Sequence, residues 1–258
     1  MADDKLEKTA SMSMTRPSFI PVGDEGTEHI TREDLQIPRL ALAQGLTPQV
    51  TAGLEGFSVG MLFNSISNKI YGKGPIYFYI LRADKPRFIE FYPRETGGGV
   101  KDMNVAAGDP RTQFTVGPQG QSIKPAATKF YDYFILMEPF TPDNFMEQLI
   151  ALSFKSSGLK MARQLNMFIK QRQTPIWSGR YVMRTKIMTN AKGTFAVYDI
   201  DNAGWPPDDE TMHLLKSTYE SLKDRQVIVH YESAGGDDSF DAETLEREAE
   251  EARQAPRM

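Results

Sequence analysis

The chain has 258 residues, of which 40% are hydrophobic, 25% charged and 10% aromatic, which is the composition of a globular protein with one large core. It contains no cysteine, which excludes disulfides, thiolate metal sites and cysteine nucleophiles and fits a cytoplasmic location. No apolar run approaches the roughly 20 residues of a membrane-spanning helix, and the chain starts without an apolar signal segment. We therefore expect a cytoplasmic protein that does not enter a membrane.

The first half of the chain is punctuated by short apolar segments. Residues 1–29 mix charged and small residues without periodicity, which predicts a flexible leader. An apolar segment, Ile37–Gln44 (IPRLALAQ), follows, in which Pro38 opposes a regular helix start. β-Branched and aromatic residues bounded by turn formers predict strands over 57–66, 76–82 and 88–94, and the short connection 83–87 would make the last two a hairpin.

The middle of the chain alternates strand and helix signals. Residues 95–129 are rich in Gly, Pro, Gln and Thr, which predicts a long loop or arm, and strand character resumes over 129–138 and 149–155. A helix is expected from Ser156 or Ser157 to about Gln171, because its apolar residues recur on one face. That apolar face contains Leu159, Ala162, Leu165, Phe168 and Ile169.

The remainder predicts a hairpin, a second helix and a tail. Strands over 181–189 and 194–200 flank the turn Asn190–Gly193. Asp208 is expected to cap a helix that runs to about Leu222, and 225–231 reads as a last strand. Residues 233–258 are acidic and predict a disordered tail.

These elements predict a mainly β protein. Many short strands, one helix inserted between strands and one near the C-terminus are typical of an OB-like Greek-key barrel elaborated by long hairpins and loops. We expect a single OB-like nucleic-acid-binding domain over residues 30–232, between the leader and the tail.

The distribution of charge is uneven. Residues 148–198 contain no Asp or Glu but nine Lys or Arg, whereas 199–258 contain sixteen acidic residues against six basic ones. Such a basic stretch indicates a surface that binds a polyanion. The alternative is a solvated basic face that meets the acidic third of the same protein.

No enzyme signature is present. The three histidines, His29, His213 and His230, are isolated from one another, and no phosphate-binding loop or nucleophile elbow occurs. Asp199 and Asp201 lie two residues apart and could chelate Mg²⁺, but a role in capping a turn explains two carboxylates better. We expect no catalytic residue, no metal and no cofactor.

Basic and aromatic residues interleave in the acid-free stretch, a combination that suits single-stranded DNA. Three aromatic residues, Trp177, Tyr181 and Tyr198, are candidates to stack on bases, although any single aromatic could instead belong to the core. Trp177 is the best exposed candidate, because it lies between Pro175 and Gly179. The predicted backbone contacts are Lys155, Lys160, Arg163, Lys170, Arg172, Arg180, Arg184, Lys186 and Lys192.

A family resemblance agrees with this interpretation. The opener Ile37–Gln44, the segment Leu149–Ile169 (LIALSFKSSGLKMARQLNMFI), the strand pair around Asn190–Gly193 and the acidic C-terminus together resemble single-stranded-DNA-binding proteins of tailed phages. The resemblance implies an OB-fold, a role in DNA replication and recombination, and an acidic tail that contacts replication or recombination proteins. The chain ends Gln254–Met258, without the terminal aromatic or apolar signature of such tails.

Two alternatives remain open. The chain could be a β-rich virion structural or assembly subunit, whose long loop and termini reach into neighbouring copies. It could also be an enzyme or a nuclease accessory factor that uses Asp199 and Asp201 for a metal-dependent activity. Homo-oligomerisation is compatible with each of these interpretations.

Overall fold

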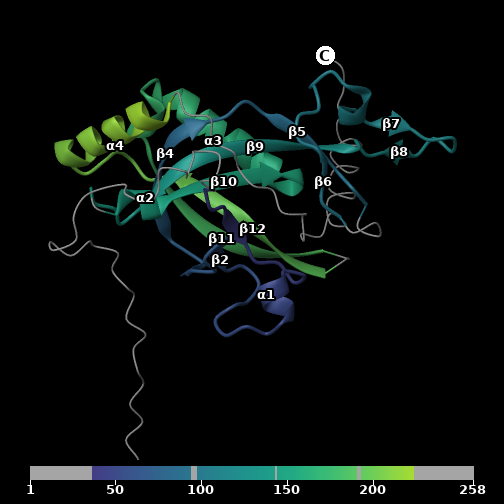
Figure 1. Ribbon diagram of the computed structural model, residues 1–258, viewed down its shortest axis with the longest axis horizontal. Coiled ribbons are helices and arrows are strands. Elements are labelled where there is room, and N and C mark those ends of the chain that lie inside the picture. The colour runs from purple at the N-terminus through teal and green to yellow at the C-terminus, as the bar shows by residue number, and fades with distance from the viewer. Residues whose placement is uncertain (1–36, 94–97, 143, 191–192, 224–258) are drawn as a thin grey trace, which may run out of the picture.

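The computed structural model describes residues 37–93, 98–142, 144–190 and 193–223. The predicted leader, the strand over 225–231, the acidic tail and Lys192 lie outside the described residues. The expectation of a mainly β protein is confirmed (Figure 1).

A seven-stranded antiparallel sheet forms the centre of the molecule, in the order β12–β11–β4–β9–β5–β6, with β10 paired to β9. Its long strands are rich in β-branched and aromatic residues, which favour this conformation. The strands are β4 (Ile76–Ala83), β5 (Arg87–Phe91), β6 (Val100–Asp102), β9 (Ala127–Met137), β10 (Leu149–Lys155), β11 (Arg180–Asn190) and β12 (Gly193–Asn202).

Four of these strands form a Greek key. β4, β9 and β10 follow one another in the sheet, and β11 returns to lie beside β4, which gives the order β11–β4–β9–β10. The helix α3 (Leu159–Arg172) makes the long connection from β10 to β11, and β12 then pairs with β11 as a hairpin. This is the predicted insertion of a helix between strands. Among the described residues β10 and β12 do not pair, so the sheet does not close into the predicted OB-like barrel and an open seam remains between these two strands.

A strap of residues 38–44 bridges the open seam. On one side, the amide of Ala151 in β10 donates to the carbonyl of Pro38 at 2.8 Å. On the other side, the Gln44 side chain exchanges two hydrogen bonds of 2.9 Å with the backbone of Ala196 in β12. The strap contains β1 (Leu40–Leu42), which forms a small sheet with β2 (Leu62–Asn64) and β3 (Ile70–Gly72). A side-chain amide thus takes the place of strand pairing at the edge of β12.

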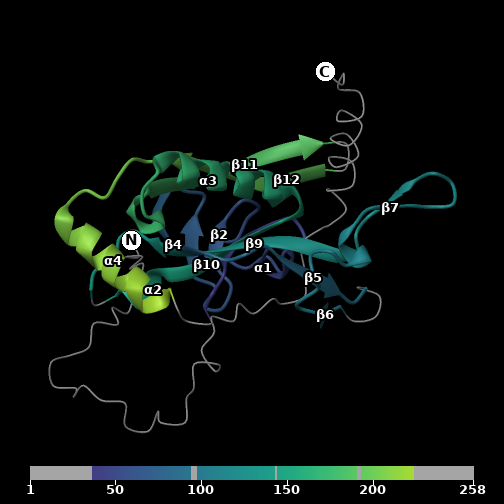
Figure 2. The same ribbon diagram turned by 90° about the horizontal axis from the view of Figure 1, so that it is seen from above.

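The sheet separates two apolar cores, because successive side chains of a strand point to opposite faces. We call the first the interior core; it joins residues such as Phe78 and Tyr133 to Ala162 and Leu165 of α3 and to Leu40 of the strap. The second, the outer core, is covered by the helix α4 (Asp209–Leu222). In Figure 2, α4 lies at the end of the molecule opposite the β7 hairpin.

The predicted helices are confirmed. α3 begins at Leu159 after a 3₁₀ turn of Ser156–Gly158, so neither serine is its N-cap. α4 is capped as expected, since the Asp208 carboxylate accepts from the Thr211 amide at 2.7 Å. Two further helices, α1 (Pro48–Thr51) and α2 (Phe145–Gln148), are single turns. None of the helices in the described ranges is long and apolar enough to span a membrane.

The predicted hairpin over 76–94 is wrong. Both β4 and β5 pair with β9 and run in the same direction, so they are consecutive pieces of one bent strand. The chain does not reverse because Asp84 continues the pairing through its amide, which donates to the Asp132 carbonyl at 2.9 Å. An ion pair between Arg87 and the buried Asp132 at 3.0 Å holds β5 in line. The strand expected over 57–66 is likewise reduced to β2.

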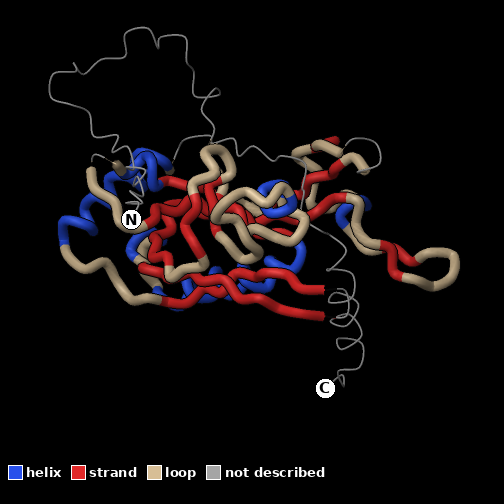
Figure 3. The backbone as a smooth tube through the Cα atoms, turned by 90° about the horizontal axis from the view of Figure 1, so that it is seen from below, coloured by secondary structure: helices blue, strands red, loops and turns tan. Residues whose placement is uncertain are grey.

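The sequence predicted as a long loop is an arm with structure of its own. After β6 and the 3₁₀ turn η3 (Pro110–Thr112), the chain forms a hairpin of β7 (Thr115–Val116) and β8 (Ser122–Ile123). Figure 3 shows this hairpin projecting from the molecule. We call residues 113–123 the arm.

The base of the arm is held by a cluster of charges. The Arg111 guanidinium contacts Glu90 at 2.7 Å, Asp102 at 3.1 Å and Asp109 at 2.9 Å, and Lys101 also contacts Glu90 at 2.6 Å. Hydrogen bonds from Lys101 and then Arg111 lower the pKa of Glu90, and those from Arg111 lower the pKa of Asp109. The arm is therefore attached to the sheet by ion pairs rather than by an apolar core.

Candidate nucleic-acid interface

Three predicted contact residues lie in a row on the outer face of α3. Because Ala162 and Leu165 of this helix are buried in the interior core, Lys160, Arg163 and Lys170 point to solvent, as the helical period predicted. They extend over ten residues, or about 15 Å at 1.5 Å per residue. Within the described part of the chain none of them has an ion pair or hydrogen bond through its side chain. Their charges are available to an anionic ligand.

An exposed tryptophan lies at the C-terminal end of the same helix. Trp205 is 52% exposed, and the guanidinium carbon of Arg172, in the last turn of α3, lies 4.6 Å from the centre of its ring. We call Lys160, Arg163, Lys170 and Trp205 the α3 surface. Trp205 is not among the residues predicted from the sequence, although it lies between a glycine and two prolines, the same kind of signal that indicated Trp177.

Arg172 itself has a structural role. Its guanidinium donates to the carbonyl oxygens of Gly204 at 2.6 Å and Arg180 at 3.0 Å, and also bonds the side chain of Asn202. A guanidinium held by backbone oxygens is fixed in place and oriented by the protein. Arg172 therefore positions Trp205, and its guanidinium is already engaged by the protein, so its predicted contact with DNA backbone stays a prediction that these bonds do not favour.

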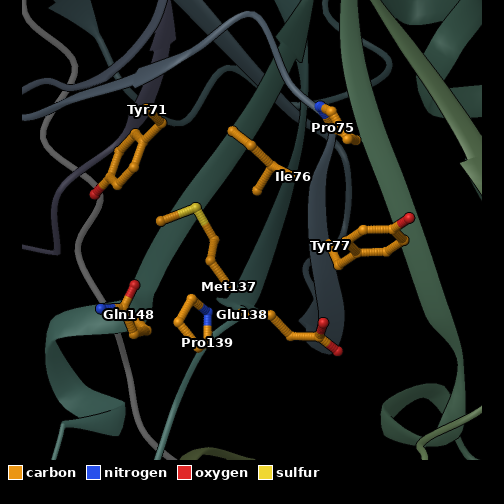
Figure 4. Close-up of a pocket in the computed structure, with 8 residues that line it drawn as sticks. All are labelled: Tyr71, Pro75, Ile76, Tyr77, Met137, Glu138, Pro139 and Gln148. Atoms are coloured by element: carbon orange, nitrogen blue, oxygen red, sulfur yellow. The ribbon is translucent and has the colours of Figure 1, made fainter.

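Arg180 is likewise engaged within the protein. Its Nε and Nη2 atoms donate to the Glu138 carboxylate at 2.8 and 2.6 Å, and the Tyr79 hydroxyl donates to the same carboxylate at 2.8 Å. Burial opposes ionisation of Glu138, but these hydrogen bonds outweigh it and keep its pKa below the ordinary value. Glu138 also lines an open hollow of about 370 Å³ with Met137, which Figure 4 shows. Since Arg180 neutralises Glu138, its charge is compensated within the protein, and its predicted contact with DNA stays a prediction.

The cations of the β11–β12 hairpin face the side of the strand that the period of two predicted, but they are paired. Lys186 contacts Asp199 at 2.9 Å, and Arg184 lies 3.8 Å from Asp201. These exposed pairs are weak, so a polyanion could compete for the two cations. Asp199 and Asp201 are thus partners of these two cations. No group of three or more acidic or histidine side chains in the described ranges could hold a metal.

Of the three stacking candidates, Tyr181 is buried and Tyr198 is partly buried. Tyr181 is 1% exposed in the interior core, where its ring lies 5.6 Å from that of Phe78, and burial raises its pKa. The Tyr198 hydroxyl donates to the carbonyl of Leu40 at 3.2 Å, its ring meets Phe154 edge-on, and burial raises its pKa to about 12. Burial contradicts the prediction that Tyr181 stacks on a base, because the apolar side of β11 faces the interior core. Tyr198 packs against the same core, and its contact with DNA stays a prediction.

Two further predicted residues, Trp177 and Lys155, are half-buried. Trp177 packs against the outer core and is half-buried, so it is less exposed than its loop sequence predicted. Lys155, at the end of β10, is also half-buried. Seven of the nine cations of the run thus separate into the exposed row on α3, a paired set on β11 and two arginines inside the protein's own contacts, while Lys155 is half-buried and Lys192 lies outside the described residues.

Comparison with known proteins gives one match. A family model described as Pam3 phage gp34-like protein matches residues 8–228. No curated protein and no solved structure matches the chain.

Proposed function

We propose that this chain, which belongs to the Pam3 phage gp34-like protein family, binds single-stranded DNA without sequence preference. It would act in DNA replication or recombination in the host cytoplasm, without catalysing a reaction. The observation that carries the proposal is the α3 surface, where Lys160, Arg163 and Lys170 form a row that ends at Trp205.

The composition of this surface favours a single strand over a duplex. Three cations along one helix can neutralise successive phosphates of a flexible backbone. An exposed indole ring can stack on a base only when that base is unpaired and turned outward, as in single-stranded DNA. Neither group reads base edges, so the surface supports binding without sequence preference.

The fold supports the same proposal. Partly open five-stranded Greek-key barrels of the OB type bind oligonucleotides with a strand face and with loops that project from the barrel. Here the β11–β12 hairpin extends beyond its pairing with β4 and carries Arg184 and Lys186. We infer that these two cations contribute to DNA binding after they leave Asp201 and Asp199.

The acidic tail has a proposed role in regulation. Residues 237–251 contain eight acidic side chains and one basic one, so the tail can compete with DNA for the cations of α3. When DNA displaces it, the tail becomes available to replication or recombination proteins. Deletion of residues 236–258 should then raise the affinity for DNA at low salt; an unchanged affinity would remove the competition from the proposal.

Fluorescence anisotropy of a labelled oligo-dT, titrated with the full chain at several salt concentrations, tests the proposal. We expect tight binding whose log affinity falls linearly with log salt, by about 0.7 for each phosphate contacted. Duplex DNA of the same length should compete weakly. Absence of binding at low salt would refute the proposal.

A virion structural or assembly subunit is the second candidate function. It is favoured by the arm, which projects from the molecule and exposes apolar side chains. Such a subunit should form a stable homo-oligomer without DNA and show no salt-sensitive affinity for oligo-dT. The anisotropy titration and a measurement of mass in solution together distinguish the two candidates.

A further inference from the structure

The hollow that Glu138 lines has aromatic walls. Its volume is about 370 Å³, and its apolar part consists of Ile76 and Met137, which are 9% and 1% exposed. Tyr71 and Tyr77, both half-buried, lie on either side of these two residues (Figure 4). The volume is at the small end of the roughly 300–1,000 Å³ that is usual for ligand sites, so the hollow has room for one flat ring rather than for a large ligand.

Tyr77 is held in place by an ion pair of the protein. The Arg180 guanidinium lies 4.0 Å from the centre of the Tyr77 ring, and the carboxylate of Glu138 fixes that guanidinium with two hydrogen bonds. Tyr77 lines the hollow and Arg180 does not, so the guanidinium and the hollow meet different parts of the ring. A ring that is already fixed loses little conformational entropy when a ligand stacks on it.

Glu138 supplies a hydrogen-bond acceptor at the hollow. An ionised carboxylate offers about four lone pairs. Within the described part of the chain three of them are used, one by the Tyr79 hydroxyl and two by Arg180. The Glu138 side chain is 24% exposed, so a ligand can reach the fourth. Arg180 compensates the charge of the carboxylate, which limits its repulsion of a nearby phosphate.

The hollow is connected to the C-terminal end of the α3 surface by two arginines. The Arg172 guanidinium, which lies over the ring of Trp205, donates to the carbonyl oxygen of Arg180 at 3.0 Å. The Arg180 guanidinium in turn lies over Tyr77 at the hollow. A strand that is held along α3 and passes Trp205 can therefore continue to the hollow.

We propose that the hollow receives one unpaired base of the same DNA strand, which stacks on Tyr77 and donates an N–H to Glu138. This inference rests on the proposed function and adds a second base site to it. Every DNA base carries an N–H donor on its pairing edge, and that edge is free only in a single strand, so the site favours single strands without selecting a sequence. An open hollow alone would hold a free nucleotide weakly, whereas a base tethered through phosphates on α3 has a high effective concentration.

Anisotropy of labelled oligo-dT with the Tyr77→Leu variant tests the proposal. Loss of one stacked base should weaken binding about 5- to 150-fold, and Tyr77→Phe, which keeps the ring, should keep the affinity. The matched control is Tyr92→Leu, which removes a 48% exposed tyrosine elsewhere and should leave the affinity unchanged. Wild-type affinity in Tyr77→Leu would overturn the second base site and leave the α3 surface standing. Absence of oligo-dT binding by the wild type would overturn both.

Photo-cross-linking of the wild-type protein gives a second readout that does not depend on the folding of a variant. Oligo-dT with iododeoxyuridine in place of thymidine cross-links under light to the aromatic side chains that it contacts. Trypsin releases Tyr77 in the peptide 74–82 and Trp205 in the peptide 193–216. Both peptides should carry cross-links, the first at Tyr77 rather than at the fully buried Tyr79. Cross-links on the peptide 193–216 alone would overturn the proposal.

A competition with free thymidine monophosphate distinguishes a base of the bound strand from a separate nucleotide. An excess of the mononucleotide should leave the cross-link at Tyr77 in place, because the tethered base outcompetes it. If the mononucleotide abolishes the cross-link at Tyr77 while the one at Trp205 persists, the hollow is a nucleotide pocket independent of the strand, and the proposal is overturned.

Discussion

Neutralising the three cations of α3 tests the proposed DNA surface most directly. The change is Lys160→Gln, Arg163→Gln and Lys170→Gln in one protein. If each cation contacts one phosphate, the slope of log affinity against log salt should fall by about 2, at about 0.7 per phosphate. Between 50 and 200 mM salt, wild-type affinity would then drop roughly 20-fold more than that of the variant. The core should be unaffected, since all three side chains point to solvent.

The assay is anisotropy of labelled oligo-dT at four or more salt concentrations, with circular dichroism to confirm the fold. A matched control neutralises three exposed lysines on other elements, Lys69, Lys85 and Lys216, and changes the net charge by the same amount. The control should keep the wild-type slope. If both triple variants lose the same slope, binding depends on net charge alone and α3 is not a defined surface. If the α3 variant keeps the wild-type slope, the α3 surface does not contact DNA.

Three further predictions follow from single side chains. Trp205→Ala should weaken oligo-dT binding by about 1–3 kcal/mol. Trp205→Phe should abolish the DNA-induced quenching of tryptophan fluorescence, and Trp177→Phe should retain it. Quenching that is lost with Trp177 instead would contradict the assignment of Trp205 as the stacking tryptophan. Gln44→Ala should lower the free energy of unfolding in urea by about 1–3 kcal/mol and speed hydrogen exchange at the Ala196 amide, because two backbone hydrogen bonds are lost; unchanged exchange would show that the strap does not hold β12. Arg111→Gln should destabilise the protein at neutral pH and much less in acid. The neighbouring carboxylates have lowered pKa values, so they contribute stability above their ordinary pKa that is lost as pH falls through the lowered values. Urea titrations should therefore show a difference in unfolding free energy between wild type and variant at pH 7 that shrinks at about pH 3, and an equal difference at both pH values would refute this.

The strands and helices that the sequence predicted are those with local signals. Asp208 begins α4 because its carboxylate caps the helix, and a capping residue is visible in the sequence. The β11–β12 hairpin was predicted from its turn and its period of two, both of which depend on neighbouring residues. The predicted hairpin of β4 and β5 does not form, because its outcome depends on a residue far away in the sequence. Whether β5 folds back or continues depends on Asp132, more than 40 residues away, and no local pattern contains that ion pair.

The predicted site residues show the same difference between local and distant determinants. Helical periodicity placed Lys160, Arg163 and Lys170 on the solvent face of α3, because burial of the opposite face decides the orientation. The period of two similarly placed Tyr181 on the apolar side of β11, which was a reason to assign it to the core rather than to a DNA surface. The partners of Arg172 and Arg180 are contributed by distant or irregular segments, so their engagement could not be predicted from spacing.

A run of charge in a sequence overstates the charge that a folded surface presents. The acid-free stretch has nine cations, but Asp199 and Asp201 of β12 lie diagonally across the ladder from Lys186 and Arg184 of β11, and Glu138, which follows β9, pairs with Arg180. The acidic residues that neutralise the stretch lie outside it in sequence and next to it in space, because antiparallel pairing joins β11 to the strand that follows. The same argument identifies the cations that remain. A helix packed on one face of a sheet has no neighbouring strand on its outer face, so the charges on α3 are the part of the run that has no acidic partner among the described residues.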